Sequence, residues 1–135
     1  MKSLRIAVQM DPIEKMIVSH DTSLALMVEA QSRGHEIWWF TPNDVFYDTG
    51  VVKARAHRVS VSLDESKHYE TLETAVRALN EFDVVLVRQD PPFDMGYVSN
   101  TYLLELVKTL VINPPRGIRN ITEKMSILQF PELTP

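Results

Sequence analysis

The chain contains no cysteine among its 135 residues, which excludes disulfide bonds, thiolate nucleophiles and cysteine-ligated zinc. It has only four glycines, and none of them forms a Gly-x-Gly-x-x-Gly or Gly-Lys-Ser/Thr motif, so no glycine-rich phosphate loop is expected. The four histidines lack the spacing of metal ligands. No apolar run approaches the ~20 residues that a membrane-spanning helix needs. The net charge of −4 gives no reason to expect a nucleic acid as a partner.

The composition is that of an ordinary globular domain. Hydrophobic residues make up 44% of the sequence and charged residues 24%, and the length suits a single domain with one core. The amino terminus lacks the apolar segment and cleavage site of a signal peptide. Together with the missing cysteine, this favours a cytoplasmic protein.

The hydrophobic pattern predicts an α/β fold in which strands and helices alternate. Short aliphatic runs, typical of strands that are covered on both faces, occur at residues 4–8, 36–40, 83–87 and 111–112. Helical spacing and capping residues predict helices at 22–33, 66–80, 97–109 and 121–129. We therefore expect a three-layer, mostly parallel, Rossmann-like sheet of about four strands with flanking helices.

Three details of this pattern can be checked against a structure. Asp21 is the expected N-cap of the first helix, and Gly34 is expected to end it. The helices at 66–80 and 97–109 should each bury one apolar stripe, formed by Leu72, Ala75, Val76 and Leu79 in the first and by Leu103, Leu106, Val107 and Leu110 in the second. Residues 44–63 interrupt the alternation and predict a β-hairpin excursion with a turn at Asp48–Gly50.

The strand at 83–87 ends in polar residues that a buried strand does not require. Arg88 and Asp90 follow it directly, and Pro91 and Pro92 then stop the strand pairing. Ligands of open α/β sheets bind outside the carboxyl ends of the strands, and an arginine fork can hold a carboxylate with two hydrogen bonds. The pair therefore indicates a site for a small polar ligand, and the alternative is an Arg–Asp ion pair that closes the loop.

Four other residues are candidate ligand contacts for the same positional reason. Asp11 follows the first strand, although Asp-Pro is also common in turns. Ser23 lies in the first turn of a helix, where N-capping is the competing role. Asn113 follows the last strand and could equally close a turn. For Tyr102 we favour core packing with its hydroxyl reaching a polar partner.

Seven short motifs, in order and at compatible spacings, resemble the amino-terminal part of bacterial glutathione synthetase. They are Val8–Ile13, Asp21–Ser23, Glu29–Gly34, Ala54–His57, Arg88–Asp94 with Thr101–Glu105, Val111–Pro114 and Ile118–Lys124. Enzymes of that family are more than twice as long, and the resemblance does not extend to their ATP-grasp portion. It therefore implies a pre-ATP-grasp substrate-binding domain at 1–120 and the start of a junction at 121–135, bracketed by prolines.

The resemblance also implies a function. The whole enzyme would join γ-glutamylcysteine to glycine with ATP and Mg²⁺, through an acyl phosphate, while this chain alone would be inactive and would hold no cofactor. Arg88, Asp90, Asp11, Ser23, Tyr102 and Asn113 would contact the substrate, and Lys124 would contact nucleotide phosphate. A homo-oligomer is expected, with the 44–63 hairpin as one candidate contact. The alternatives are another ATP-grasp amino-acid ligase and a stand-alone binding domain without catalysis.

Overall fold

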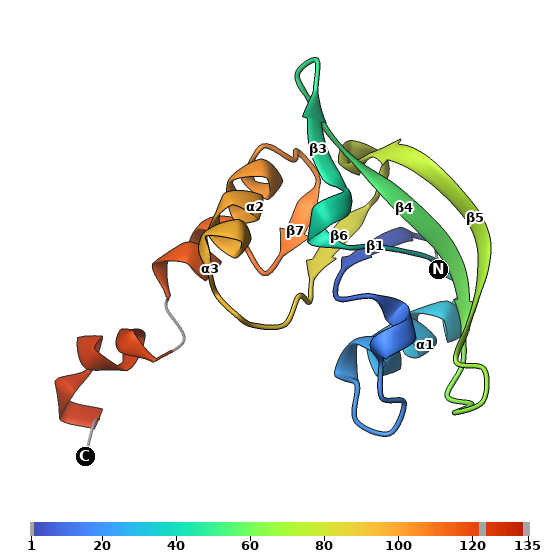
Figure 1. Ribbon diagram of the computed structural model, residues 1–135, viewed down its shortest axis with the longest axis horizontal. Helices are drawn as coiled ribbons and strands as arrows, with labels where there is room; N and C mark the ends of the chain where they lie inside the picture. Colours follow the sequence, from blue (N-terminus) through green and yellow to red (C-terminus); the bar gives the residue numbers. More distant parts are fainter. Residues whose placement is uncertain (1, 122–123, 134–135) are drawn as a thin grey trace.

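The protein folds around one seven-stranded mixed sheet (Figure 1). The computed structural model describes residues 2–121 and 124–133. The strands follow the order β3-β4-β2-β1-β6-β7, with β5 paired to β4. Their bounds are β1 Arg5–Gln9, β2 Glu36–Phe40, β3 Val45–Asp48, β4 Val51–Val61, β5 Tyr69–Ala78, β6 Val84–Val87 and β7 Leu110–Ile112.

The predicted α/β fold class and its parallel strands are confirmed. The neighbours β2, β1, β6 and β7 all run parallel. β1 lies in the middle of this part and pairs with β2 on one edge and with β6 on the other. Four of its five residues are buried, as expected for a strand with helices on both faces.

Two hydrophobic clusters cover the two faces of the sheet and confirm the three-layer arrangement. Helix α1 (Thr22–Ser32) packs Leu24 and Met27 on one face. Helices α2 (Met95–Glu105) and α3 (Pro115–Asn120) cover the other face, where Leu104 is fully buried and Ile118 packs beside it. Adjacent side chains of a strand point to opposite faces, and these clusters therefore draw on alternate residues of each strand.

The β-hairpin excursion is also confirmed. Strands β3 and β4 pair in antiparallel fashion around a turn in which Thr49 and Gly50 both have positive φ, 44° and 87°. Glycine adopts such a φ at no steric cost, which explains its place in the turn. The long strand β4 then continues past β3 to pair with β2, so the excursion is an extension of the main sheet.

The helix predicted at 66–80 is wrong, because this segment contains β5, an edge strand paired along β4. Leu72 and Val76, predicted to lie on its buried face, are more than half exposed. The side chains of Glu73, Ala75 and Arg77 alternate inward instead, with period two. The helical spacing of the apolar residues does not reflect a helix. It occurs in a strand whose Leu72 lies at a register shift in the pairing with β4.

The helices near the carboxyl end also differ from expectation. Asp94 caps α2 through the backbone N–H of Tyr97, so α2 begins earlier than predicted and ends at Glu105. Leu106 is consequently 58% exposed, whereas Leu104, outside the predicted stripe, is fully buried. The short α3 was missed. Of the predicted helix at 121–129, residues 122–123 lie outside the described residues, and Met125–Gln129 form a 3₁₀ helix.

Two further observations concern the molecule as a whole. Within residues 2–121 and 124–133, no helix has the length and apolar character needed to cross a membrane. The segment 124–133 extends away from the sheet (Figure 1), and its large apolar side chains are exposed. The expected division at residue 120 stays a prediction.

The placement of α2 can be tested with two leucines that differ in burial, Leu104 within the helix and Leu106 directly after its end. Leu104→Ala should lower the free energy of unfolding by about 2–5 kcal/mol, because it opens a cavity in the core beside α2. Leu106→Ala, the matched control on the exposed side, should change it by no more than about 0.5 kcal/mol. Urea denaturation measures both. A larger effect of Leu106→Ala would contradict this orientation of α2.

Candidate functional site

The carboxyl ends of β1 and β6 are joined by two hydrogen bonds that bring the predicted site residues together. The backbone N–H of Arg88 donates to the carbonyl of Gln9 at 2.8 Å, which continues the parallel ladder beyond β6. The backbone N–H of Asp90 then donates to Oδ2 of Asp11 at 2.9 Å. The loop after β1 and the loop after β6 are therefore fixed relative to each other.

Arg88 reaches from the end of β6 to the start of α1. Its Nε donates to Oγ of Ser23 at 3.1 Å, and its Nη2 donates to Oγ1 of Thr22 at 2.6 Å. No ion pair with a carboxylate involves Arg88 within the described part of the chain. The alternative of an Arg88–Asp90 ion pair is therefore wrong, and the positive charge of Arg88 is available to a ligand.

Asp21 holds the start of α1 in place. Its Oδ1 accepts hydrogen bonds from the backbone N–H groups of Ser23 at 2.7 Å and of Leu24 at 2.9 Å, which confirms the predicted N-cap. This cap fixes the orientation of the two hydroxyl-bearing residues that hold Arg88. The first turn of α1 thus positions the guanidinium of Arg88.

These elements enclose a cavity of about 420 Å³, which we call the Arg88 pocket. Four of the predicted contact residues line it: Asp11, Ser23, Arg88 and Asp90. The other lining residues include Lys15, His20 and Asp21, so cationic and anionic side chains face the same space. A ligand that carries both charges suits such a lining.

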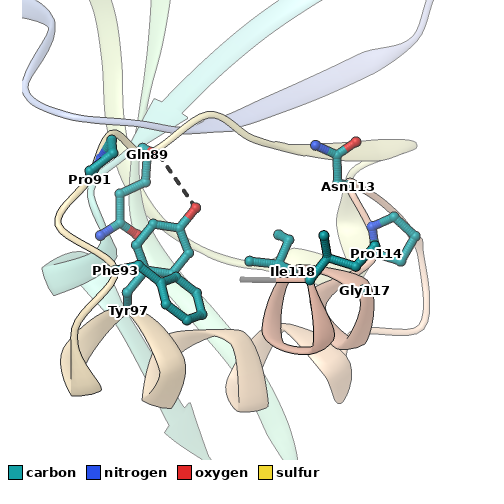
Figure 2. Close-up of a pocket in the computed structure, with 9 residues that line it drawn as sticks. Gln89, Pro91, Phe93, Tyr97, Asn113, Pro114, Gly117 and Ile118 are labelled. Atoms are coloured by element: carbon teal, nitrogen blue, oxygen red, sulfur yellow. Dashed lines mark hydrogen bonds between the residues drawn. The ribbon is translucent and has the colours of Figure 1, made fainter. Parts of the chain in front are cut away.

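A second cavity, of about 520 Å³, lies on the α2 and α3 side of the same sheet edge; we call it the Tyr97 cavity (Figure 2). It is lined by Gln89, Pro91, Phe93, Tyr97, Asn113, Pro114, Gly117, Ile118 and Ile121. The predicted contact Asn113 therefore belongs to this cavity and is separate from the Arg88 pocket. The lining contains no acidic or basic residue.

Tyr97 lines the Tyr97 cavity and interacts electrostatically with charged residues of the Arg88 pocket. Its hydroxyl donates a long hydrogen bond to the main-chain carbonyl of Gln89, at 3.4 Å. Burial raises the pKa of Tyr97, the negative charges of Asp11 and Asp90 raise it further, and Arg88 opposes them. The hydroxyl of Tyr97 is therefore neutral at physiological pH and is close enough to sense the charges of the Arg88 pocket.

The chain matches a known protein family over most of its length. The family model for the amino-terminal domain of prokaryotic glutathione synthetase matches residues 4–119. The chain belongs to this family. Its match therefore includes every residue named above at the Arg88 pocket.

Curated relatives in this glutathione synthetase family support the same assignment. Proteins named glutathione synthetase from Brucella melitensis, Mesorhizobium japonicum and Vibrio cholerae are 46%, 45% and 39% identical to the chain. Each match covers 98% of this chain but only 42–43% of the relative. The chain thus spans less than half the length of these relatives.

Two site residues expected from the glutathione synthetase resemblance lie outside both cavities. Tyr102 is 58% exposed on α2, so its predicted core packing is wrong. The guanidinium of Arg119 lies 4.0 Å from the centre of the Tyr102 ring. Tyr102 therefore takes part in a cation–π contact between α2 and α3 on the surface of the protein. Lys124 is exposed, and its contact with nucleotide phosphate stays a prediction.

The sequence predictions missed a buried amide network at the ends of β1 and β6. Nδ2 of Asn100 donates to Oε1 of Gln9 at 2.6 Å, and Nε2 of Gln9 donates to Oε1 of Gln89 at 3.4 Å. Gln9 is fully buried and Asn100 is 6% exposed. A glutamine within the apolar run of β1 was the only available signal, because a buried amide needs a partner.

Within residues 2–121 and 124–133, no three histidine, aspartate or glutamate side chains are grouped so that they could hold a metal ion. The carboxylates of the Arg88 pocket do not meet this condition either. We therefore assign no metal ligand among the described residues.

The raised pKa of Tyr97 predicts a pH dependence of stability. A tyrosine whose folded pKa exceeds its unfolded value of 10.0 stabilises the fold fully below pH 10, and the fold loses that stability as pH rises through the folded pKa. Tyr97→Phe should therefore reduce the alkaline loss of unfolding free energy, leaving the part due to Tyr69, whose pKa is also raised. Urea denaturation at stepped pH measures this, and equal slopes for wild type and variant would contradict it.

Proposed function

We propose that this chain is the dipeptide-binding part of a glutathione synthetase. The whole protein would join γ-glutamylcysteine to glycine. Three findings support this: the family match over residues 4–119, the names of relatives up to 46% identical, and the charged lining of the Arg88 pocket. The pocket carries the proposal, because it supplies the chemistry that one end of this substrate requires.

The glutamyl end of γ-glutamylcysteine bears a carboxylate and an ammonium group on the same carbon atom. A guanidinium has five N–H donors, and two of those of Arg88 are already bound to Thr22 and Ser23. We assign the remaining donors to the α-carboxylate. We assign the ammonium to Asp11 and Asp90, which face the same pocket with a carboxylate each.

An α-linked glutamyl dipeptide would fit this pocket poorly. Its α-carboxyl group is consumed in the peptide bond, and its remaining carboxylate lies two methylene groups farther from the ammonium. The Arg88 pocket would then lose either the cation contact or the anion contact. A buried or half-buried charge without its partner is costly, so such a site would discriminate between the two linkages.

The chain contributes positioning in this proposal. Arg88 and the two aspartates hold the glutamyl end so that the cysteinyl carboxylate points out of the pocket, which lowers the entropic cost of the reaction. ATP with Mg²⁺ would supply the phosphoryl group that activates the cysteinyl carboxylate for attack by the glycine amine. We assign that chemistry to the part of the relatives' length that this chain does not span, with Lys124 as a proposed phosphate contact.

Binding to the isolated chain tests the pocket. γ-Glutamylalanine, which replaces the thiol with hydrogen, should bind in calorimetry, while α-glutamylalanine and D-alanine should bind at least about tenfold more weakly. Arg88→Gln should weaken the binding of γ-glutamylalanine by roughly 10- to 100-fold, which corresponds to the loss of a hydrogen bond to a charged group. Arg55→Gln, the same change at an exposed arginine of β4, is the control. Preference for D-alanine would favour a different amino-acid ligase.

Activity measurements test the proposal that this chain positions the substrate and that the remaining part of the protein carries out the reaction. The 135-residue chain should form no glutathione from γ-glutamylcysteine, glycine and ATP. A chimera, in which this chain replaces the matched part of the Brucella melitensis relative, should form it. Arg88→Gln in the chimera should raise the KM for γ-glutamylcysteine and leave the KM for glycine unchanged.

Formation of glutathione by the chain alone would overturn the proposal that this chain only positions the substrate. An unchanged KM for γ-glutamylcysteine in the Arg88→Gln chimera would overturn the assignment of the pocket. A cytoplasmic location and a homo-oligomeric state also belong to the proposal, and both stay predictions. Mass measurement of the chimera in solution checks the second.

A further inference from the structure

The Tyr97 cavity lacks the charges that the proposed dipeptide requires, although it is the larger of the two cavities. Its volume of about 520 Å³ lies within the usual range for small-molecule sites. It borders the carboxyl ends of β6 and β7, the edge at which ligands of open α/β sheets bind. It therefore calls for a ligand of a different chemical class from that of the Arg88 pocket.

The charge of the lining excludes ionised ligands. Among the residues that the structure describes, Tyr97 is the only titratable side chain that lines the cavity, and its raised pKa keeps it neutral. An anion or a cation in this space would lose its hydration without gaining a counter-ion. The ligand that fits is uncharged.

The walls favour a flat ring. The rings of Phe93 and Tyr97 form one wall, with centroids 5.1 Å apart and planes tilted by 51°. Pro114 and Ile118 stand on the opposite side of the cavity (Figure 2). Aromatic rings and proline side chains keep their shape and offer broad apolar faces, which a planar ring can contact on both sides.

Polar groups at the sheet side of the cavity add a hydrogen-bonding edge. The Tyr97 hydroxyl directs its hydrogen to the carbonyl of Gln89, so its oxygen can accept a hydrogen bond from a ligand. Across the cavity, the side-chain amide of Asn113 makes no hydrogen bond to any residue that the structure describes (Figure 2). It can both donate and accept.

The buried amide network connects to this edge. Asn100 donates to Gln9, and Gln9 donates a long hydrogen bond of 3.4 Å to the side chain of Gln89, whose main-chain carbonyl accepts from Tyr97. Oδ1 of Asn100 is buried and has no hydrogen-bond partner within the described residues, so the network is only partly satisfied. The network thus links the Gln89 end of the polar edge to the core of the sheet.

We propose that the Tyr97 cavity is a second binding site, which takes an uncharged planar ring bearing an amide group. The ring packs between Phe93 and Ile118, and the amide meets the Tyr97 oxygen and the Asn113 side chain. This inference goes beyond the proposed ligase function and does not depend on it, because it concerns another cavity and requires no dipeptide.

Three probes of equal size test the proposal on the 135-residue chain. Benzamide, benzoate and benzamidine share a phenyl ring and differ in charge, as neutral molecule, anion and cation. Benzamide should shift the backbone ¹H–¹⁵N signals of Phe93, Tyr97, Gly117 and Ile118, and it should bind more tightly than either ion. Saturating γ-glutamylalanine should leave these shifts in place.

Two variants sharpen the test. Tyr97→Phe removes the hydroxyl oxygen that accepts the hydrogen bond and should weaken the binding of benzamide about two- to tenfold. Asn113→Asp places a carboxylate at the exposed rim of the cavity and should reverse the preference, so that benzamidine binds more tightly than benzamide. Leu106→Ala, on the exposed end of α2, is the control and should change neither affinity. Circular dichroism confirms that each variant is folded.

Three results would overturn the proposal. The first is an absence of shifts with benzamide up to its solubility limit. The second is an equal response to all three probes, which would indicate unspecific contact with apolar surface. The third is a set of shifts centred on Ser23 and Arg88. Each leaves the dipeptide-binding test intact, since that test reads the other pocket.

Discussion

The parallel pairing of β1 on both of its edges determines where every residue of the candidate site lies. β1 is held between β2 and β6, and the ladder continues past the strand ends, where Met10 donates to Phe40 and Arg88 donates to Gln9. Asp11 and Arg88 therefore leave the sheet side by side. A slip of one residue in either pairing would turn the site residues to the opposite face of the sheet.

The strand end at 88–90 separates two chemically different spaces. Because successive residues of an extended segment point to opposite sides, Arg88 and Asp90 line one cavity and Gln89 lines the other. The charged cavity borders the start of α1, and the uncharged one borders α2 and α3. The segment 88–90 thus forms part of the wall of both cavities.

Sequence reasoning predicted the parts of the structure that depend on local signals. The buried strands, the Asp21 cap, the hairpin turn at Gly50 and the meeting of Asp11, Ser23, Arg88 and Asp90 all follow from patterns within a few residues or from the rule for strand ends. It failed where tertiary pairing overrode the pattern. β5 has a helical spacing of apolar residues, but its partner β4 determines its structure. Asn113 and Tyr102 were placed by sequence position alone, which does not say which face of the sheet or of a helix a side chain occupies.

The adjacent tryptophans of β2 give the molecule an optical probe for each of its two cores. Trp38 packs against Phe82 in the cluster beneath α2 and α3, while Trp39 belongs to the cluster beneath α1 and stacks on His57. A protein in which one of the two is replaced by phenylalanine would report fluorescence from a single side of the sheet. The order in which the two layers form during refolding could then be resolved without any attached label.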